Sequence, residues 1–301
     1  MLSYICEVKR MNDRLKAVQR MQRYIESHLG EVITPADLAA VSYFSPWYAR
    51  RLFEEYTGLT PARYIRRLKL SRSALRLRDE RCTVLDTALD MGFGSAEGYQ
   101  RAFRTEFGIN PRAYAEAPVP IPLFTPSLVE SDESERNDSM ENVKTIFVTE
   151  VKKPARKVII KRGIKADEYR SYCEEVGCDV WGILVSIKSI GGEPVCMWLP
   201  EHLRKPKANI YVQGAEVPED YSGPVPDGFE VIDLPAGDFL MFRGEPFDEE
   251  NYVSAIQQVW QAEEKFDLSA SGYMPDDRNP RIQLEPVGTR GYIELVPVKN
   301  L

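Results

Sequence analysis

Apolar residues recur with helical spacing throughout the first 117 residues. Between residues 12 and 29, apolar side chains stand at positions 15, 18, 21, 25 and 29, a spacing that places them on one face of a helix. Thr34 followed by Pro35 is typical of a helix start, because threonine caps the helix and proline fits its first position. Another helix is predicted from Pro61 to about residue 78, with many arginines away from its apolar side. The pattern predicts an all-α first domain over residues 1–117.

Short runs with alternating apolar residues begin at residue 142. They predict strands at residues 143–148, 157–161, 195–199, 210–217, 229–234, 238–243 and 292–298. Helical spacing returns at about 166–176 and 249–266. Strand runs followed by helices predict an α+β domain with a mostly antiparallel sheet over residues 142–301.

Residues 118–141 separate the two patterns. The prolines between 118 and 126 exclude a helix there, because proline lacks an amide hydrogen and restricts the residue before it. Residues 130–139 are polar and show no periodicity. We therefore expect residues 118–141 to form an exposed, mobile connector between the two domains.

The first domain contains an internal repeat, which appears when the sequence is compared with itself at an offset of 50 residues. The identical pairs are Ser45 and Ser95, Arg51 and Arg101, Phe53 and Phe103, Gly58 and Gly108, Pro61 and Pro111, and Tyr64 and Tyr114. Each copy therefore has the same plan, a short helix, a tight turn, a second helix and then a Gly-apolar-polar-Pro sequence.

Each copy predicts a helix-turn-helix unit. In the first copy, residues 37–41 form the short helix, 42–45 the turn and 46–56 the second helix, which ends at Gly58. In the second copy, residues 83–91 form the short helix and 92–94 the turn, and a helix capped by Ser95 runs to residue 107. The predicted buried stripe of the second helices is Leu52, Phe53, Tyr56, Phe103 and Phe107.

The opposite faces of these second helices are polar. The exposed residues expected there are Trp47, Arg50 and Arg51 in the first copy and Glu97, Gln100, Arg101 and Arg104 in the second. Such a helix fits a major groove, where arginine binds guanine and glutamine binds adenine. The alternative is a helical bundle whose arginines are only solvated. Two copies in phase, joined by a basic helix, favour DNA binding over that alternative.

Net charge separates the two domains. The chain carries −7 overall, but residues 1–117 carry +5 and residues 118–301 carry −12, which indicates different partners. No apolar run reaches the roughly 18–20 residues that span a membrane, and the first residues lack the features of a secretory signal. Five scattered cysteines suit a reducing compartment. We expect a cytoplasmic protein that uses no membrane, cofactor or metal, with two histidines and no Gly-rich nucleotide loop.

An ordered series of motifs runs from residue 33 to residue 116. It comprises Leu38-Ala39, Ser45, Arg51-Leu52-Phe53, Thr57-Gly58-Leu59-Thr60-Pro61, Tyr64-Ile65-Arg66-Arg67-Leu68, Gly92-Phe93, Arg101-Ala102-Phe103-Arg104 and Phe107-Gly108-Ile109-Asn110-Pro111-Arg112-Ala113-Tyr114. In these motifs the chain resembles the DNA-binding domain of the AraC family. The resemblance implies two helix-turn-helix units held by one linking helix at about 61–78, with two recognition helices in successive major grooves.

The same resemblance implies roles for individual residues. The base-reading candidates are Trp47, Arg50, Arg51, Ala96, Glu97, Gln100 and Arg101. The candidates for phosphate contacts, which set register without reading sequence, are Arg63, Arg66, Arg67 and Arg104. Ala96 and Glu97 stand where family members often have longer polar donors, and a glutamate can accept a hydrogen bond from cytosine.

Aromatic residues in the second domain lie close in sequence to carboxylates. The rings are Trp181, Trp198, Tyr211, Tyr273 and Tyr292, and the carboxylates are Glu285, Glu294 and Asp233. Aromatic walls with a buried carboxylate suit a lipophilic cation, through cation–π contacts and direct charge pairing. The alternative is that these rings are ordinary core residues.

Several segments of the second domain carry a further resemblance. They are residues 210–218, 226–232, 235–242 and 292–298. In them the chain resembles the GyrI-like effector-binding domain that follows the AraC-type module in Rob-like regulators. The resemblance implies a duplicated β-α-β-β fold whose halves face each other across a ligand groove, and a ligand-contacting glutamate whose position Gln283 takes here. Glu285 lies two residues on, on the same strand face. The ligand-binding candidates are Trp181, Trp198, Tyr211, Tyr273, Gln283 and Glu285.

These features together predict a ligand-responsive transcriptional activator rather than an enzyme. Its expected partners are double-stranded DNA, a lipophilic or cationic small-molecule effector, and RNA polymerase. One alternative is a hydrolase fused to a DNA-binding module, with Glu285 or Glu294 as general base. Another is a constitutive DNA-binding protein whose second domain only contacts other proteins.

Overall fold

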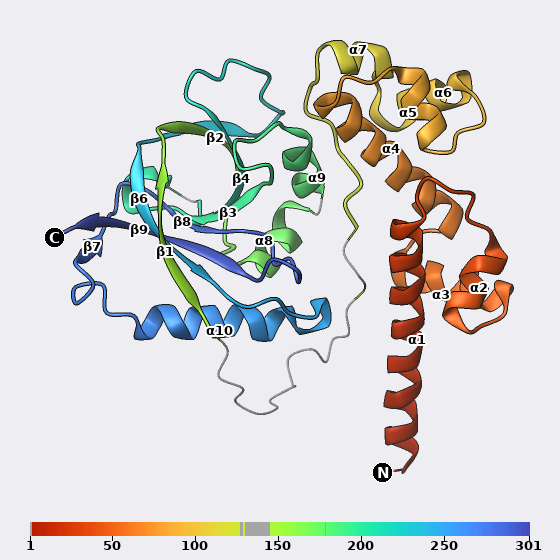
Figure 1. Cartoon of the computed structure of the whole chain (residues 1–301), viewed down its shortest axis with the longest axis horizontal. Helices are drawn as coiled ribbons and strands as arrows, with labels where there is room; N and C mark the ends of the chain where they lie inside the picture. Colours follow the sequence, from red (N-terminus) through yellow and green to blue (C-terminus); the bar gives the residue numbers. More distant parts are fainter. Residues whose placement is uncertain (1, 127–128, 130–144, 178, 207) are drawn as a thin grey trace. The chain divides into compact units, whose positions relative to one another are not determined.

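The computed structural model of the chain divides into two compact units (Figure 1). It describes residues 2–126, 129, 145–177, 179–206 and 208–301. The first unit contains the described residues up to 119 together with 124–126 and 129. The second unit contains residues 120–123 and the described residues from 145 onward.

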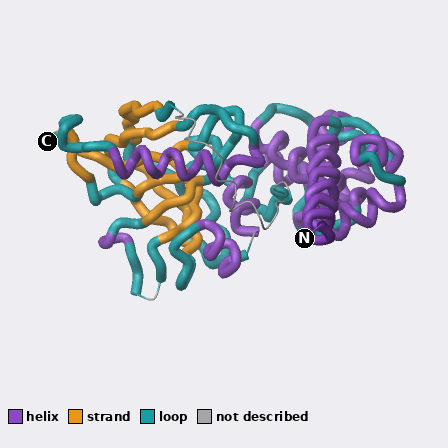
Figure 2. The backbone as a smooth tube through the Cα atoms, turned by 90° about the horizontal axis from the view of Figure 1, so that it is seen from below, coloured by secondary structure: helices purple, strands orange, loops and turns teal. Residues whose placement is uncertain are grey.

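Helices joined by loops make up the first unit, and its described residues contain no strand (Figure 2). The helices are α1 (Leu2–Ser27), α2 (Pro35–Ser42), α3 (Pro46–Thr57), α4 (Pro61–Asp79), α5 (Val84–Asp90), α6 (Ala96–Phe107) and α7 (Pro111–Glu116). The all-α prediction is therefore confirmed. The side chains of Thr34, Ser45, Thr60, Thr83, Ser95 and Asn110 each accept a hydrogen bond from a backbone amide of the helix that follows. These caps satisfy amides that would otherwise lack a partner, which explains why the helices begin at these positions.

Helix α4 connects the two helix-turn-helix units. Tyr64 and Leu68 pack in a buried cluster with residues of α1, α2 and α3. Further along the helix, the Ser73 hydroxyl accepts a hydrogen bond from the buried Tyr99 hydroxyl of α6 at 3.0 Å. One helix thus contributes to the cores of both helix-turn-helix units.

The described residues of the second unit form one antiparallel sheet. Its strands are β1 (Phe147–Lys153), β2 (Arg156–Arg162), β3 (Val195–Trp198), β4 (Tyr211–Pro218), β5 (Glu230–Leu234), β6 (Gly237–Arg243), β7 (Tyr273–Pro275), β8 (Arg281–Gln283) and β9 (Ile293–Asn300). The helices are α8 (Tyr169–Val176), α9 (Asp179–Ser186) and α10 (Tyr252–Lys265), with short 3₁₀ helices η2 (Glu201–Leu203) and η3 (Glu249–Asn251). The strand order is β1-β6-β9-β8-β3-β4-β2-β5, and β7 pairs with β9. The antiparallel α+β prediction is confirmed.

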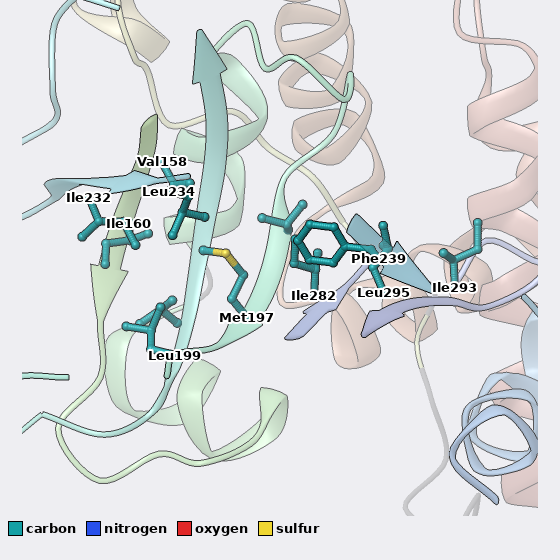
Figure 3. Packing of buried hydrophobic residues seen from close by; sticks show 12 residues of the cluster. Val158, Ile160, Met197, Leu199, Ile232, Leu234, Phe239, Ile282, Ile293 and Leu295 are labelled. Carbon is teal, nitrogen blue, oxygen red and sulfur yellow. The ribbon is translucent and has the colours of Figure 1, made fainter. Parts of the chain in front are cut away.

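The two faces of this sheet have different coverings. One face contributes to a purely apolar cluster, in which side chains from β2, β3, β5, β6, β8 and β9 pack together (Figure 3). On the other face, residues of α8 and α9 pack over Tyr211 and Ala215 of β4. Helix α10 runs across the strands (Figure 1, Figure 2) and packs over Leu240 and Phe242 of β6 and Tyr292. The helix-covered face therefore has two apolar clusters, one under α8 and α9 and one under α10.

Some boundaries differ from the prediction. Strand β1 begins at residue 147, whereas a strand was predicted at 143–148, of which 143 and 144 lie outside the described residues. Helices α7 and α9 and the short strands β7 and β8 were not predicted. Strands β7 and β8 contain three residues each, too few to show an alternating pattern.

The expectation of an exposed connector over 118–141 is wrong at its start. The side chains of Ile121 and Leu123, which alternate with prolines, are buried. The Ile121 amide donates to the Ser186 hydroxyl of α9 at 3.0 Å. The Leu123 carbonyl lies against Gly182 of α9, where a Cβ added to Gly182 would be 2.0 Å from the Leu123 carbonyl oxygen. Residues 120–123 form no helix or strand of their own and are held by their contacts with α9. Residues 127, 128 and 130–141 of the expected connector lie outside the described residues.

Candidate functional site

The two helix-turn-helix units position α3 and α6 in the same way. Ser45 caps α3 and Ser95 caps α6, each by accepting a hydrogen bond from the amide three residues later, at 3.4 Å and 3.1 Å. Both helices end at a glycine, Gly58 with φ 69° and Gly108 with φ 73°. Such φ values are strained for residues with a Cβ, so these glycines end the helices at low cost.

Helices α3 and α6 bury equivalent positions. The buried residues are Ala49, Leu52 and Phe53 in α3 and Tyr99, Ala102 and Phe103 in α6, which correspond pairwise at an offset of 50. The predicted stripe residues Tyr56 and Phe107 are partly buried. Each helix is therefore fixed by one apolar face, and the side chains on its opposite face are left outside the core.

The predicted base-reading side chains lie on these outer faces. Arg50 and Arg51 of α3 and Glu97, Gln100 and Arg101 of α6 are exposed, and Ala96 is partly exposed. Trp47 is 69% exposed although it is a large apolar side chain, and the Arg51 guanidinium lies 5.7 Å from the centre of its ring. The arrangement offers flat, hydrogen-bonding and cationic groups together, which are the groups that contact base edges.

The predicted phosphate-contacting arginines occupy two kinds of environment. Arg63 and Arg66 of α4 and Arg104 of α6 are exposed and form no ion pair with any residue that the structure describes. Arg67 instead pairs with Glu106 at 2.6 Å, and its guanidinium lies 4.6 Å from the centre of the Phe124 ring. Three of the four residues are thus available to a partner, and Arg67 is engaged within the unit.

A row of polar side chains crosses the helix-covered face of the sheet in the second unit. Gln213 of β4, Cys196 of β3, Gln283 of β8 and Glu294 of β9 are consecutive cross-strand partners, and all four are buried. Paired residues of antiparallel strands share a face. We call these four residues the polar row. It lies on the face that carries the apolar clusters under α8 and α9 and under α10.

Glu294 is the centre of a charged network next to this row. Its side chain has no exposed surface and accepts hydrogen bonds from Trp260 Nε1 at 2.6 Å and the Tyr292 hydroxyl at 2.5 Å. Arg281 Nε donates to the other carboxylate oxygen at 2.7 Å and also pairs with Glu263 through Nη2 at 2.7 Å. We call Glu294, Tyr292, Trp260, Arg281 and Glu263 the Glu294 cluster. All donors of the cluster converge on two acidic side chains.

Burial changes the protonation of one of these acids. Desolvation, together with the neighbouring Glu294 carboxylate, raises the pKa of Glu263 to about 9. A buried carboxyl beside another carboxylate favours its neutral form, because two like charges cannot both be solvated there. At neutral pH Glu263 is therefore a neutral carboxylic acid.

The predicted ligand-binding residues are only partly brought together. Trp181, Trp198 and Tyr211 share one apolar cluster, and Gln283 lies in the polar row beside them. Tyr273 belongs to the cluster under α10 and pairs with Asn300, six residues beyond Glu294 and so roughly 20 Å along β9. Glu285 lies beyond the end of β8, where its side chain is exposed.

Arg281, Trp260 and Glu263 were missed as site residues. The cationic partner of Glu294 comes from β8, a strand too short to be recognised, and the cross-strand pairing that joins them is absent from local sequence patterns. Trp260 and Glu263 are three residues apart on α10, a spacing that puts both on one helix face. This spacing of Trp260 and Glu263 was the sequence signal that could have identified them as neighbours on one helix face.

Comparison with known proteins identifies the first unit. A protein-family model described as a helix-turn-helix domain matches residues 38–117. The right origin-binding protein of Escherichia coli strain K12 is 32% identical over 106 residues, which are 35% of this chain and 37% of that protein. The chain thus matches little more than a third of that relative's length. Regulatory protein SoxS of Salmonella typhimurium is 32% identical over 97 residues, which are 32% of this chain and 91% of that protein.

A solved structure matches the same share of the chain. The AraC-type transcriptional regulator from Chromobacterium violaceum has 25% sequence identity and a TM-score of 0.32, and the match covers 35% of this chain and 96% of that one. In the described part of the present chain, no helix is long and apolar enough to cross a membrane. The family assignment rests on the sequence relatives, above all on SoxS, nearly the whole of which is matched. The chain belongs to the AraC family of helix-turn-helix transcriptional regulators.

Proposed function

We propose that this chain binds specific sequences of double-stranded DNA, with α3 and α6 reading bases in two successive major grooves. The observation that carries the proposal is the equivalence of the two helices. They bury the same three positions and expose the same outer positions, fifty residues apart. A duplicated reader of this kind covers two groove segments on one face of the duplex without requiring a second chain.

Within this proposal, base reading falls to Trp47, Arg50 and Arg51 of α3 and to Ala96, Glu97, Gln100 and Arg101 of α6. Arg63, Arg66 and Arg104 are proposed to contact phosphates, since they are exposed and have no ion-pair partner among the described residues. Arg67 was expected to share this role, and its pair with Glu106 favours a structural one. Phosphate contacts predict binding that weakens steeply as salt rises.

We propose an effector-binding role of the GyrI-like kind for residues 142–301, the second of the two domains expected from the sequence. The element order supports it, because β2 is followed by α8, α9, β3 and β4, and β6 is followed by α10, the three-residue strand β7, β8 and β9. Strands β3 and β8 of the two series pair with each other. The aromatic rings beside the polar row supply surface for a lipophilic small molecule.

The proposed output is activation of transcription through contact with RNA polymerase. The test is transcription in vitro from a promoter that carries a DNA site selected by the full chain. We expect transcripts to increase with added protein, and to change further when a ligand of the second unit is present. Repression at every position of the site would overturn activation and leave DNA binding intact.

The DNA-binding proposal itself is tested by fluorescence anisotropy. The full chain is titrated into a duplex obtained by selection from random sequences, and into a scrambled duplex of the same composition. We expect the selected duplex to bind at least a thousandfold more tightly at physiological salt, the usual margin for specific sites. Equal binding to both duplexes would overturn the proposal.

A further inference from the structure

The Glu294 carboxylate already has a cationic partner within the chain. Arg281 pairs with Glu294 and with Glu263. The other carboxylate oxygen of Glu294 accepts hydrogen bonds from Trp260 and Tyr292. A carboxylate in an apolar site attracts a cationic ligand when its charge is not balanced. Here the balancing charge belongs to the protein.

The charges of the cluster also cancel. Glu263 is protonated at neutral pH because its pKa is raised to about 9. The ion pair that remains in the cluster is the one between Arg281 and Glu294. A lipophilic cation that entered the site would therefore meet no net attraction, and it would have to compete with a resident guanidinium.

The groups that remain accessible are not the acidic ones. Glu294 has no exposed surface and the Glu263 side chain is 11% exposed, whereas the Arg281 side chain is 37% exposed. The Arg281 guanidinium lies 5.1 Å from the centre of the Trp198 ring, and Trp260 is also partly exposed. A ligand that approaches the cluster thus meets indole rings and a guanidinium, with the carboxylate behind them.

We propose that this site takes aromatic ligands that carry no positive charge, and that Arg281 acts as a built-in cation that excludes lipophilic cations. The inference rests on the proposed effector-binding role of the second unit and names its ligand class. The sequence alone is compatible with a lipophilic ligand that is cationic and with one that is not. The position of Arg281 favours the ligand without a positive charge.

The test uses three probes of similar shape and different charge. They are tetraphenylphosphonium, tetraphenylborate and neutral triphenylphosphine oxide, each titrated into the full chain by calorimetry and tryptophan fluorescence. We expect the wild-type chain to bind tetraphenylphosphonium at least about tenfold more weakly than triphenylphosphine oxide. Arg281→Met should raise tetraphenylphosphonium affinity by about tenfold or more, since the buried carboxylate then lacks its partner.

Two variants control for charge and for general effects of losing an arginine. Arg281→Lys keeps the positive charge and should keep the weak binding of tetraphenylphosphonium. Arg243→Met removes an exposed arginine that also lies over an aromatic ring, Phe147, at 5.4 Å, and should leave all three affinities unchanged. If Arg281→Met fails to fold, Glu294→Gln serves instead, because the acid that then remains beside Arg281 is the protonated Glu263, and the unbalanced guanidinium should strengthen tetraphenylborate binding about tenfold.

The outcomes separate this inference from the proposed function. Wild-type binding of tetraphenylphosphonium as tight as that of the neutral probe, or no gain in Arg281→Met, would overturn the inference while ligand binding itself stands. An unchanged tetraphenylborate affinity in Glu294→Gln would overturn it in the same way. Failure of every probe to bind any variant at millimolar concentration would overturn the effector role of the second unit, and the inference with it.

Discussion

Arginines of the first unit differ in what their guanidinium groups contact. Arg51 lies beside the exposed Trp47 ring on α3, and Arg66 is exposed on α4 without an ion-pair partner among the described residues. Arg67, its neighbour in sequence, is paired with Glu106 and packed on Phe124. We therefore propose base reading for Arg51, phosphate contact for Arg66 and a structural role for Arg67, on the basis of their different surroundings.

Arg51→Ala is expected to weaken binding to the selected DNA site by about 1–3 kcal/mol, the contribution of one good bidentate contact to a base. Binding to scrambled DNA should change far less, because phosphate contacts dominate it. Anisotropy titrations measure both. Arg112→Ala, which removes a highly exposed arginine of α7, is the matched control. An Arg51 variant that discriminates the two duplexes as well as wild type does would remove Arg51 from the base-reading set.

Arg66→Ala and Arg67→Ala should have different effects. The first should weaken binding to all duplexes and reduce the slope of log affinity against log salt by about 1, as expected for one lost phosphate contact. The second should lower the stability of the first unit by about 1 kcal/mol, because it leaves the partly buried Glu106 without its partner. Salt-dependent titrations and thermal unfolding separate the two effects. The same salt slope in Arg66→Ala and wild type would count against phosphate contact.

Glu263 makes stability depend on pH. Its pKa is raised in the folded chain, so its contribution to stability is fully present below the ordinary pKa of glutamate and is lost as pH rises towards about 9. Wild type should lose up to about 1.4 kcal/mol per pH unit across this window. Glu263→Gln should remove most of that slope, and Glu264→Gln, next to it and exposed, should keep it. Urea unfolding at pH 5.5, 7.0 and 8.5 provides the comparison, and parallel pH profiles for wild type and Glu263→Gln would refute the assignment.

A glycine follows each of the two equivalent helices α3 and α6 and ends it. Gly58 and Gly108 follow α3 and α6 with left-handed backbone angles, and a Cβ at either position would have open space around it. The cost of substitution is therefore the strain of the backbone alone. The equivalent ends in both copies explain why α3 and α6 have the same length.

Gly58→Ala is expected to destabilise the first unit by about 1 kcal/mol, the cost of a left-handed angle for a residue with a Cβ. Gly94→Ala is the matched control, since Gly94 also has open space but does not have a left-handed angle. It should leave the melting temperature unchanged or slightly higher. Equal destabilisation by the two substitutions would show that the backbone angle is not the cause.

Sequence patterns predicted the first unit better than the second. Helix caps and apolar spacing are local, so the faces carrying Phe53 and Phe103 could be assigned from sequence. Arg281 and Glu294 are thirteen residues apart and meet because β8 pairs with β9. Ile121 and Leu123 lie among prolines, and their burial depends on Gly182 leaving room for the backbone. Such contacts arise from tertiary packing, which local periodicity does not contain.

The two units of the chain have opposite charges and different chemistry. The basic first unit has two equivalent helices with exposed polar faces, and the acidic second unit contains a sheet with a buried ion-pair network. This division supports a regulator that binds DNA with one unit and a small molecule with the other. DNA binding and ligand binding should therefore be separable by substitution, with Arg51 variants affecting the first and Arg281 variants the second.

The most direct measurement is the base preference of wild type, Arg51→Ala and Arg101→Ala, determined by selection from random duplexes and sequencing. Two equivalent readers predict two blocks of preferred bases about one helical turn apart, roughly 10–10.5 base pairs. Each variant should lose preference in one block and keep it in the other. A single block in wild type, or loss of both blocks in each variant, would contradict a duplicated reader.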